Sequence, residues 1–213
     1  VAVMLGDYLI SKAFHLCSTM GDPSINLALG EVTNTLCEGE VIQLHRRNDM
    51  NLTEDVYLDL VSRKTGSLIG ACCRLSCVIS GGTESQCKAL DDFGQQMGVA
   101  FQITDDVLDL FGETAVTGKS VGRDLDLGKM TLPLLRLRDE LGPERRVEFD
   151  LVVQERDRTG LQKLLDGSKA MESTMNSARN LVEQAKSRLS VLPDGPALNL
   201  MLQLADGVLT RQA

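Results

Sequence analysis

One segment of the sequence places several polar side chains on a single face of an expected helix. A rotation of about 100° per residue puts four of them within an arc of about 100°: Gln102, Asp105, Asp106 and Asp109. Carboxylates this close repel one another even in water. Magnesium relieves such repulsion, since it prefers carboxylate oxygens together with water and phosphate. The spacing suits a divalent-cation site, but it also suits a solvated acidic face, which spacing alone favours.

Two further segments offer groups that would bind an anion beside such a cation. The stretch Thr117–Lys129 interleaves three glycines with lysines and acids. Ammonium groups complement phosphate oxygens, and glycines let the backbone approach them closely. Lys64-Thr65, in an upstream helix, would add another ammonium group and a hydroxyl, although an isolated Lys-Thr pair is more often an ordinary surface pair. Together with the acidic face, these segments predict a site for a diphosphate bridged by magnesium.

The order of the motifs is similar to that of one known family, the trans-prenyltransferases or polyprenyl diphosphate synthases. The matching segments are Gly39–Leu44 (GEVIQL), Lys64-Thr65, Phe101–Asp109 and Gly118–Lys129. Leu5–Leu9 (LGDYL) resembles the helix that follows the first aspartate-rich motif of that family. The resemblance covers essentially the whole chain and is strongest over residues 1–135. It rests on the ordered set, because no single motif would be specific.

The resemblance implies a fold and a reaction. The fold would be an all-α, isoprenoid-synthase-type bundle of long antiparallel helices around a central apolar cavity, with two aspartate-rich helices facing each other across its mouth. The reaction would be Mg²⁺-dependent chain elongation, in which an allylic prenyl diphosphate ionises and its cation joins isopentenyl diphosphate. Diphosphate is released and a proton is lost. Departure of diphosphate separates charge, a step that metal ions and lysines assist.

The resemblance also assigns roles to residues of this sequence. Asp105 would be the principal metal ligand, with Asp106 and Asp109 supporting it directly or through water. The residues that would bind the allylic diphosphate are Lys64, Lys119 and Lys129. Asp124 would hold metal-bound water, and the residues near the developing cation or leaving group would be Thr65, Gln102 and Gln43. The candidate catalytic residues are therefore Asp105, Lys64, Thr65 and Gln102.

Two elements of the family pattern do not occur in these 213 residues. They are the first aspartate-rich motif and the upstream basic residues that bind isopentenyl diphosphate. Val1 aligns just after the place where the first motif should end, so we expect an N-terminally truncated form of an active enzyme, itself nearly inactive. The alternative is a non-catalytic partner subunit of a prenyl diphosphate synthase, against which the intact acidic face and lysines argue. A terpene cyclase is disfavoured, since its Asn/Ser/Glu metal motif does not occur here.

Helices are the elements that must position these residues. The chain is 43% hydrophobic but only 3% aromatic and has no Trp, a composition that favours helix over a β-sandwich. Apolar spacing and capping residues predict helices over Val1–Met20, from Asp22-Pro23 to about Arg47, from Thr53 to Ile79, and from about Glu84 to Phe111. Residues 112–130 are expected to form a loop. From Thr131 onward we expect shorter helices, broken near Gly142-Pro143, Gly160, Gly167 and Pro193–Pro196, within one domain over residues 1–213.

The charge and the cysteines restrict the partners and the compartment. Thirty acidic and 22 basic residues give a net charge of −8, which argues against nucleic acid as a partner. Six cysteines without a CxxC pair predict reduced, buried thiols in a cytoplasmic protein. No stretch reaches the roughly 18 consecutive apolar residues of a transmembrane segment. The family resemblance adds a homodimer.

Single residues outside the motifs receive structural interpretations. Four methionines are expected in the core or in a cavity wall: Met4, Met20, Met97 and Met130. His15 and His45 are expected to be exposed or hydrogen-bonded residues of helices. A basic residue near the C-terminus often occurs in the family and could reach a diphosphate, but we expect Arg211 to lie in an exposed tail.

Overall fold

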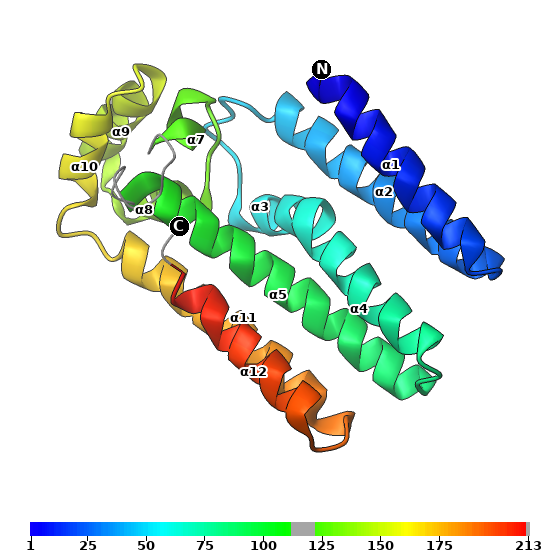
Figure 1. The fold of residues 1–213 in the computed structure, drawn as a ribbon. Helices are drawn as coiled ribbons and strands as arrows, with labels where there is room; N and C mark the ends of the chain where they lie inside the picture. Colours follow the sequence, from blue (N-terminus) through cyan, green and yellow to red (C-terminus); the bar gives the residue numbers. More distant parts are fainter. Residues whose placement is uncertain (112–121, 212–213) are drawn as a thin grey trace.

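The computed structural model describes residues 1–111 and 122–211 of the chain. These residues form helices and no strand, so the all-α class predicted from the sequence is confirmed (Figure 1). The α-helices are α1 (Ala2–Thr19), α2 (Pro23–His45), α3 (Glu54–Val61), α4 (Ser67–Ile79), α5 (Glu84–Phe111), α7 (Arg123–Asp126), α8 (Leu132–Glu140), α9 (Pro143–Gln154), α10 (Arg158–Leu165), α11 (Ala170–Arg188) and α12 (Pro196–Leu209). A π-helical turn covers Ser62–Gly66, and a 3₁₀ turn covers Leu189–Val191.

Local signals in the sequence fix the starts of two helices. The Asp22 carboxylate accepts a hydrogen bond from the amide of Ser24, and Pro23 occupies the first turn of α2. The Thr53 hydroxyl accepts from the amide of Val56 at the start of α3. Both predicted caps are confirmed. The predicted helix from Thr53 to Ile79 is confirmed as one unbroken helical run, although its Ser62–Gly66 turn is π-helical and divides it into α3 and α4.

Helix α5 is the central element of the bundle. It packs against α4 on one side and α11 on the other (Figure 1). Ile103, Val107 and Leu110 of α5 are buried in the core, together with most of the short helix α8. Because these apolar residues anchor one side of α5, its polar residues are held at fixed positions on the other side.

The segment after α5 differs in part from the predicted loop. Residues 123–126 form the single turn α7 between Gly122 and Gly128, both of which have positive φ angles (+79° and +69°). A left-handed backbone is easily adopted by glycine alone, so these two glycines fold the segment back on itself. Lys119 lies outside the described residues.

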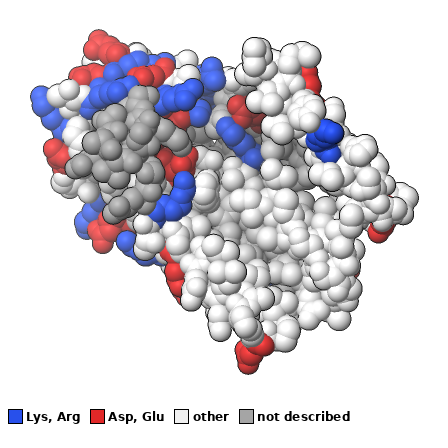
Figure 2. Space-filling view, in the orientation of Figure 1, with Lys and Arg blue, Asp and Glu red and all other residues white. Residues whose placement is uncertain are grey.

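Helices α1 and α2 form a pair at the edge of the bundle (Figure 1). No residue of α1 is buried. Met4 and Met20, predicted to be core or cavity-wall residues, are 71% and 51% exposed, whereas Met97 and Met130 are buried as predicted. Charged side chains gather over the end of the molecule that holds α7–α10, and the rest of the face in Figure 2 carries few of them. No helix within residues 1–111 and 122–211 is long and apolar enough to cross a membrane.

Candidate active site

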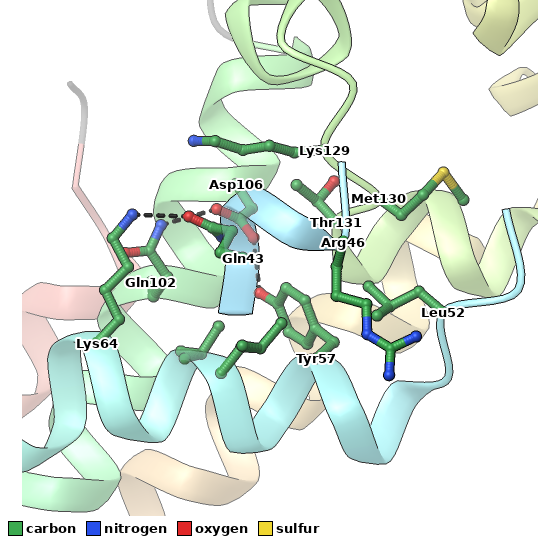
Figure 3. Close-up of a pocket in the computed structure, with 12 residues that line it drawn as sticks. Gln43, Arg46, Leu52, Tyr57, Lys64, Gln102, Asp106, Lys129, Met130 and Thr131 are labelled. Atoms are coloured by element: carbon green, nitrogen blue, oxygen red, sulfur yellow. Dashed lines mark hydrogen bonds between the residues drawn. The ribbon is translucent and has the colours of Figure 1, made fainter. Parts of the chain in front are cut away.

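A small polar pocket lies where α2, α3 and α5 meet the segment after α7 (Figure 3). Its cavity volume is about 30 Å³, enough for about one water molecule. It brings together five residues that the sequence analysis assigned to the site: Gln43, Lys64, Gln102, Asp106 and Lys129. These residues come from four separate segments, so the fold assembles much of the predicted constellation.

The Asp106 carboxyl group is buried in the wall of the pocket, with 4% of the residue exposed. Its Oδ2 accepts a hydrogen bond of 2.7 Å from the Tyr57 hydroxyl. Its Oδ1 accepts one of 2.8 Å from Nε2 of Gln102. Burial raises the pKa of Asp106 to about 7, because the two hydrogen bonds only partly offset the loss of water. Burial and the nearby Asp106 carboxylate likewise raise the pKa of Tyr57 well above its usual value.

Gln102 links Asp106 to the π-helical turn. Its Oε1 accepts a hydrogen bond of 3.2 Å from the Thr65 hydroxyl, while its Nε2 donates to Asp106. The two contacts fix the orientation of the amide, with its oxygen toward Thr65 and its nitrogen toward Asp106. A chain of hydrogen bonds therefore runs from Thr65 through Gln102 and Asp106 to Tyr57, and it locks α3, the π-helical turn and α5 together.

Contacts between glycines place the π-helical turn against α5. A Cβ atom at Gly98 would lie 2.7 Å from Cα of Gly66 and 3.1 Å from the carbonyl oxygen of Thr65. A Cβ atom at Gly94 would lie 2.7 Å from Cα of Gly70, one turn further along α4. The backbones can approach this closely only because side chains are missing there. The approach brings Thr65 within reach of Gln102, and π-helical turns are frequent at functional sites.

The Lys64 ammonium group is held by two residues of α2. Its Nζ lies 2.7 Å from Oε2 of Glu40. It also donates a 2.9 Å hydrogen bond to Oε1 of Gln43, drawn as a dashed line in Figure 3. Gly39 allows this crossing of α2 and the π-helical turn, since a Cβ atom there would come within 3.0 Å of Cβ of Arg63. The GEVIQL segment thus supplies both the packing surface and the partners of the lysine.

Asp109 supports the segment that carries Lys129. Its two carboxylate oxygens accept from the backbone amides of Arg123 (3.2 Å) and Asp124 (2.9 Å), at the start of α7. Burial raises the pKa of Asp109, and these amides partly oppose that rise. The Lys129 ammonium group in turn lies 2.7 Å from Oδ1 of Asp124. Asp109, Asp124 and Lys129 therefore form one connected group.

Asp105 faces a different neighbour, near the end of the chain. Its side chain is 39% exposed and lies 3.9 Å from Nη2 of Arg211. The Arg211 guanidinium lies over the Phe101 ring, 3.9 Å from its centre, which is a favourable cation–π distance. The expectation of an exposed tail is wrong for Arg211, because the side chain returns to α5 beside the acidic residues.

The acidic residues fit a magnesium ion only as a partial ligand set. Within residues 1–111 and 122–211, no group of three or more His, Cys, Asp or Glu side chains converges closely enough to hold a metal. Asp106 and Asp109 have their oxygens engaged in hydrogen bonds. Magnesium commonly uses one or two carboxylates and completes its shell with water and substrate phosphate. The half-exposed Asp105 carboxylate meets that requirement.

Some residues of the site escaped the sequence analysis. Tyr57 was missed, although it lies seven residues before Lys64, a spacing that puts both on one face of a helix. Thr131, buried with an unpartnered hydroxyl among the described residues, also lines the pocket. Glu40 lies in the GEVIQL segment but was given no role, because its contact with Lys64 joins distant segments, for which local spacing gives no signal. Arg211 was considered as a diphosphate contact but was expected in an exposed tail.

Comparisons with known proteins identify the family. The sequence model for polyprenyl synthetase matches residues 1–166. Octaprenyl diphosphate synthase of Escherichia coli is 33% identical over 208 residues, which are 96% of this chain and 64% of that protein. Geranylgeranyl pyrophosphate synthase of Geoglobus acetivorans is 34% identical over 221 residues, covering 99% of this chain and 67% of that protein.

A solved structure gives the same answer for the fold. The polyprenyl synthase from Caulobacter crescentus, crystallised with calcium and isoprenyl diphosphate, is similar with a TM-score of 0.93 and 32% identity. The similarity covers 99% of this chain and 66% of that one. The chain thus spans about two thirds of the length of these relatives. The predicted resemblance is confirmed, and the chain belongs to the polyprenyl synthetase family.

Proposed function

We propose that the protein acts in prenyl chain elongation, joining an allylic prenyl diphosphate to isopentenyl diphosphate with release of diphosphate and with Mg²⁺ as the cofactor. The observation that carries this proposal is the placement of Lys64 and Lys129 in one pocket with Gln102 and Asp106 of α5. The relatives of this chain reported above are prenyl diphosphate synthases. A similar protein was crystallised with calcium and isoprenyl diphosphate. A non-catalytic partner subunit is not favoured, because both lysines and all three acids are present.

Counting donors shows how the lysines would bind a diphosphate. An ammonium group has three donors. Among the described residues, Lys64 uses two of them, on Glu40 and Gln43, and Lys129 uses one, on Asp124. Within that part of the chain, each lysine therefore keeps at least one donor for a phosphate oxygen while its position is fixed by neighbours. Fixed donors aimed at the leaving diphosphate would stabilise the charge that develops as the allylic bond breaks.

The other residues have supporting roles in this proposal. Asp105 would hold the magnesium ion, and Asp106, Asp109 and Asp124 would surround it. Bound to the diphosphate, the ion would supply positive charge to its oxygens as it departs. The Gln102 amide, oriented by Asp106 and Thr65, would lie near the developing cation.

An elongation assay tests the proposal. The chain, and the longest natural polypeptide that contains it, would be incubated with radiolabelled isopentenyl diphosphate, allylic diphosphates and Mg²⁺. From the longer polypeptide we expect longer prenyl diphosphates that disappear in excess chelator, whereas the 213-residue chain by itself should be nearly inactive. Lys64→Ala and Lys129→Ala should each reduce turnover at least tenfold, because a tenfold loss corresponds to about the free energy of one hydrogen bond to a charged group. The control is Lys163→Ala, on the exposed side of α10, which should leave turnover unchanged. Equal turnover in chelator would refute the metal role.

We also propose a cytoplasmic homodimer. The helix pair α1–α2 exposes many large apolar side chains, among them Val3, Met4, Leu9 and Leu27, each more than half exposed. Many exposed large apolar side chains on one helix pair are typical of a surface that another protein covers. Sedimentation equilibrium should give a dimer at micromolar concentration, and a stable monomer would count against it.

A further inference from the structure

Two turns that are distant in sequence share an unusual backbone conformation. In the part of the chain that the structure describes, Asn48 (φ +60°) and Arg156 (φ +59°) are the non-glycine residues with positive φ. Asparagine adopts this conformation more readily than most residues, whereas for arginine it costs about 1–2 kcal/mol relative to a right-handed backbone. Asn48 follows α2 and Arg156 follows α9, yet Nη2 of Arg156 donates a 2.6 Å hydrogen bond to Oδ1 of Asn48.

Gly128 lies directly against this pair of residues. The amide of Asn48 donates a 2.8 Å hydrogen bond to the carbonyl oxygen of Gly128. A Cβ atom at Gly128 would collide with Oδ1 of Asn48 and lie 3.0 Å from Nη2 of Arg156. Gly128 is itself left-handed and buried. The three residues form one contact, which we call the Asn48 clasp (Asn48, Gly128 and Arg156).

The clasp is adjacent to Lys129. The Lys129 amide donates a 2.9 Å hydrogen bond to the carbonyl oxygen of Asp124, and its ammonium group pairs with the Asp124 side chain. Asp124 is tied to α5 through Asp109. Lys129 is thus held on one side by α5, through Asp124, and on the other by the clasp, through its neighbour Gly128.

Stability alone does not explain the clasp. Asn48 is exposed and Arg156 is only half-buried, so their hydrogen bond contributes little net stability. Glycine at either position would adopt the same φ without the steric cost. Costly backbone conformations that persist in this way are typical of functional sites.

We propose that Asn48 and Arg156 are positioning residues for Lys129. By fixing the backbone at Gly128, they hold the lysine where its remaining donors meet the substrate diphosphate. This inference rests on the proposed function, in which Lys129 binds that diphosphate. Neither residue lies in a motif from which the site was predicted.

Paired substitutions at Asn48 separate positioning from stability. Asn48→Gly keeps the left-handed backbone but removes the acceptor for Arg156. Asn48→Asp keeps an acceptor and still tolerates the left-handed conformation. We expect Asn48→Gly to weaken binding of inorganic diphosphate with Mg²⁺ by about three- to tenfold, the scale of coupling between residues of one network, with an unchanged melting temperature. Asn48→Asp should bind like the native chain. The control is Arg179→Ala, which removes an exposed 2.6 Å Arg–Asn contact on α11.

Two measurements complete the test: calorimetry of diphosphate binding in a double variant, and hydrogen exchange of the amides next to Lys129. In a Lys129→Ala background, Asn48→Gly should cause no further loss, because both changes act on one contact. Amide exchange of residues 128–130 should accelerate in Asn48→Gly and not in Asn48→Asp. If binding depends on Lys129 but not on Asn48, or exchange at 128–130 is unchanged, the inference is overturned while the proposed function stands. If the native chain does not bind diphosphate, the proposed function fails, and the inference fails with it.

Discussion

Replacing Asp106 with asparagine tests whether the buried carboxyl group is retained at a cost in stability. The pKa of Asp106 is raised from 3.8 to about 7 in the folded chain, mainly by burial. The folded state therefore binds a proton more tightly than the unfolded state. As a result, the contribution of Asp106 to the free energy of unfolding is most favourable below pH 4. This contribution decreases as the pH rises from about 4 to 7 and is constant above that range. Across the whole interval the loss is roughly 4 kcal/mol.

Asparagine at position 106 would avoid this loss while keeping a hydrogen bond to each neighbour. Its amide oxygen can accept from Nε2 of Gln102, and its amide nitrogen can donate to the Tyr57 hydroxyl oxygen. The buried Tyr57 O–H then loses its acceptor, at a cost of about 1–3 kcal/mol. Because the amide carries no charge, we expect Asp106→Asn to be more stable than the native chain by about 1–3 kcal/mol at pH 8, and this gain should be about 2 kcal/mol smaller at pH 5.5.

Urea unfolding at pH 5.5 and pH 8, with chelator present, measures these differences. Asp105→Asn is the matched control, since it makes the same chemical change at a carboxylate that is 39% exposed and should give no comparable gain in stability at pH 8. The reasoning is refuted if Asp106→Asn is less stable than the native chain at pH 8. That result would mean that the hydrogen bonds from Tyr57 and Gln102 outweigh the burial of the carboxylate.

Three further substitutions address the rest of the site. Gly98→Ala places a Cβ atom 2.7 Å from a Cα atom of the π-helical turn, so we expect the free energy of unfolding in urea to fall by about 1–3 kcal/mol and diphosphate binding to weaken. The control Gly6→Ala, with open space around it, should show neither effect. Glu40→Gln should strengthen diphosphate binding in calorimetry, because it removes a negative charge 2.7 Å from Lys64. Asp105→Ala should lower turnover by two orders of magnitude or more and change stability by less than about 0.5 kcal/mol.

The parts of the fold that could be predicted from the sequence are those with local causes. Asp22 and Thr53 cap their helices through hydrogen bonds to amides two and three residues away, so a short window contains the whole signal. The bounds of α5, Glu84–Phe111, follow from glycines before it and apolar periodicity within it. The site motifs were found for a related reason, since their residue types and order are specific to one family.

The parts that could not be predicted depend on contacts between distant segments. The π-helical turn exists where Gly66 meets Gly98, more than 30 residues away, and nothing in the local sequence distinguishes it from a regular helix. Arg211 lies over Phe101, 110 residues earlier in the chain. The clasp joins Asn48 to Arg156 across a sequence separation of 108 residues. In each case the neighbour, rather than the local sequence, determines the conformation.

The three acids of α5 show why spacing alone could not assign their roles. They share one helix face, yet Asp105 is half-exposed beside an arginine, and Asp106 is buried with a pKa of about 7. Asp109 binds the backbone at the start of α7. A solvent-facing carboxylate can bind a cation at little cost, whereas a buried, hydrogen-bonded one must first give up its partners. Direct ligation is therefore easiest at Asp105, while Asp106 and Asp109 are better placed to fix Gln102 and Lys129 around it.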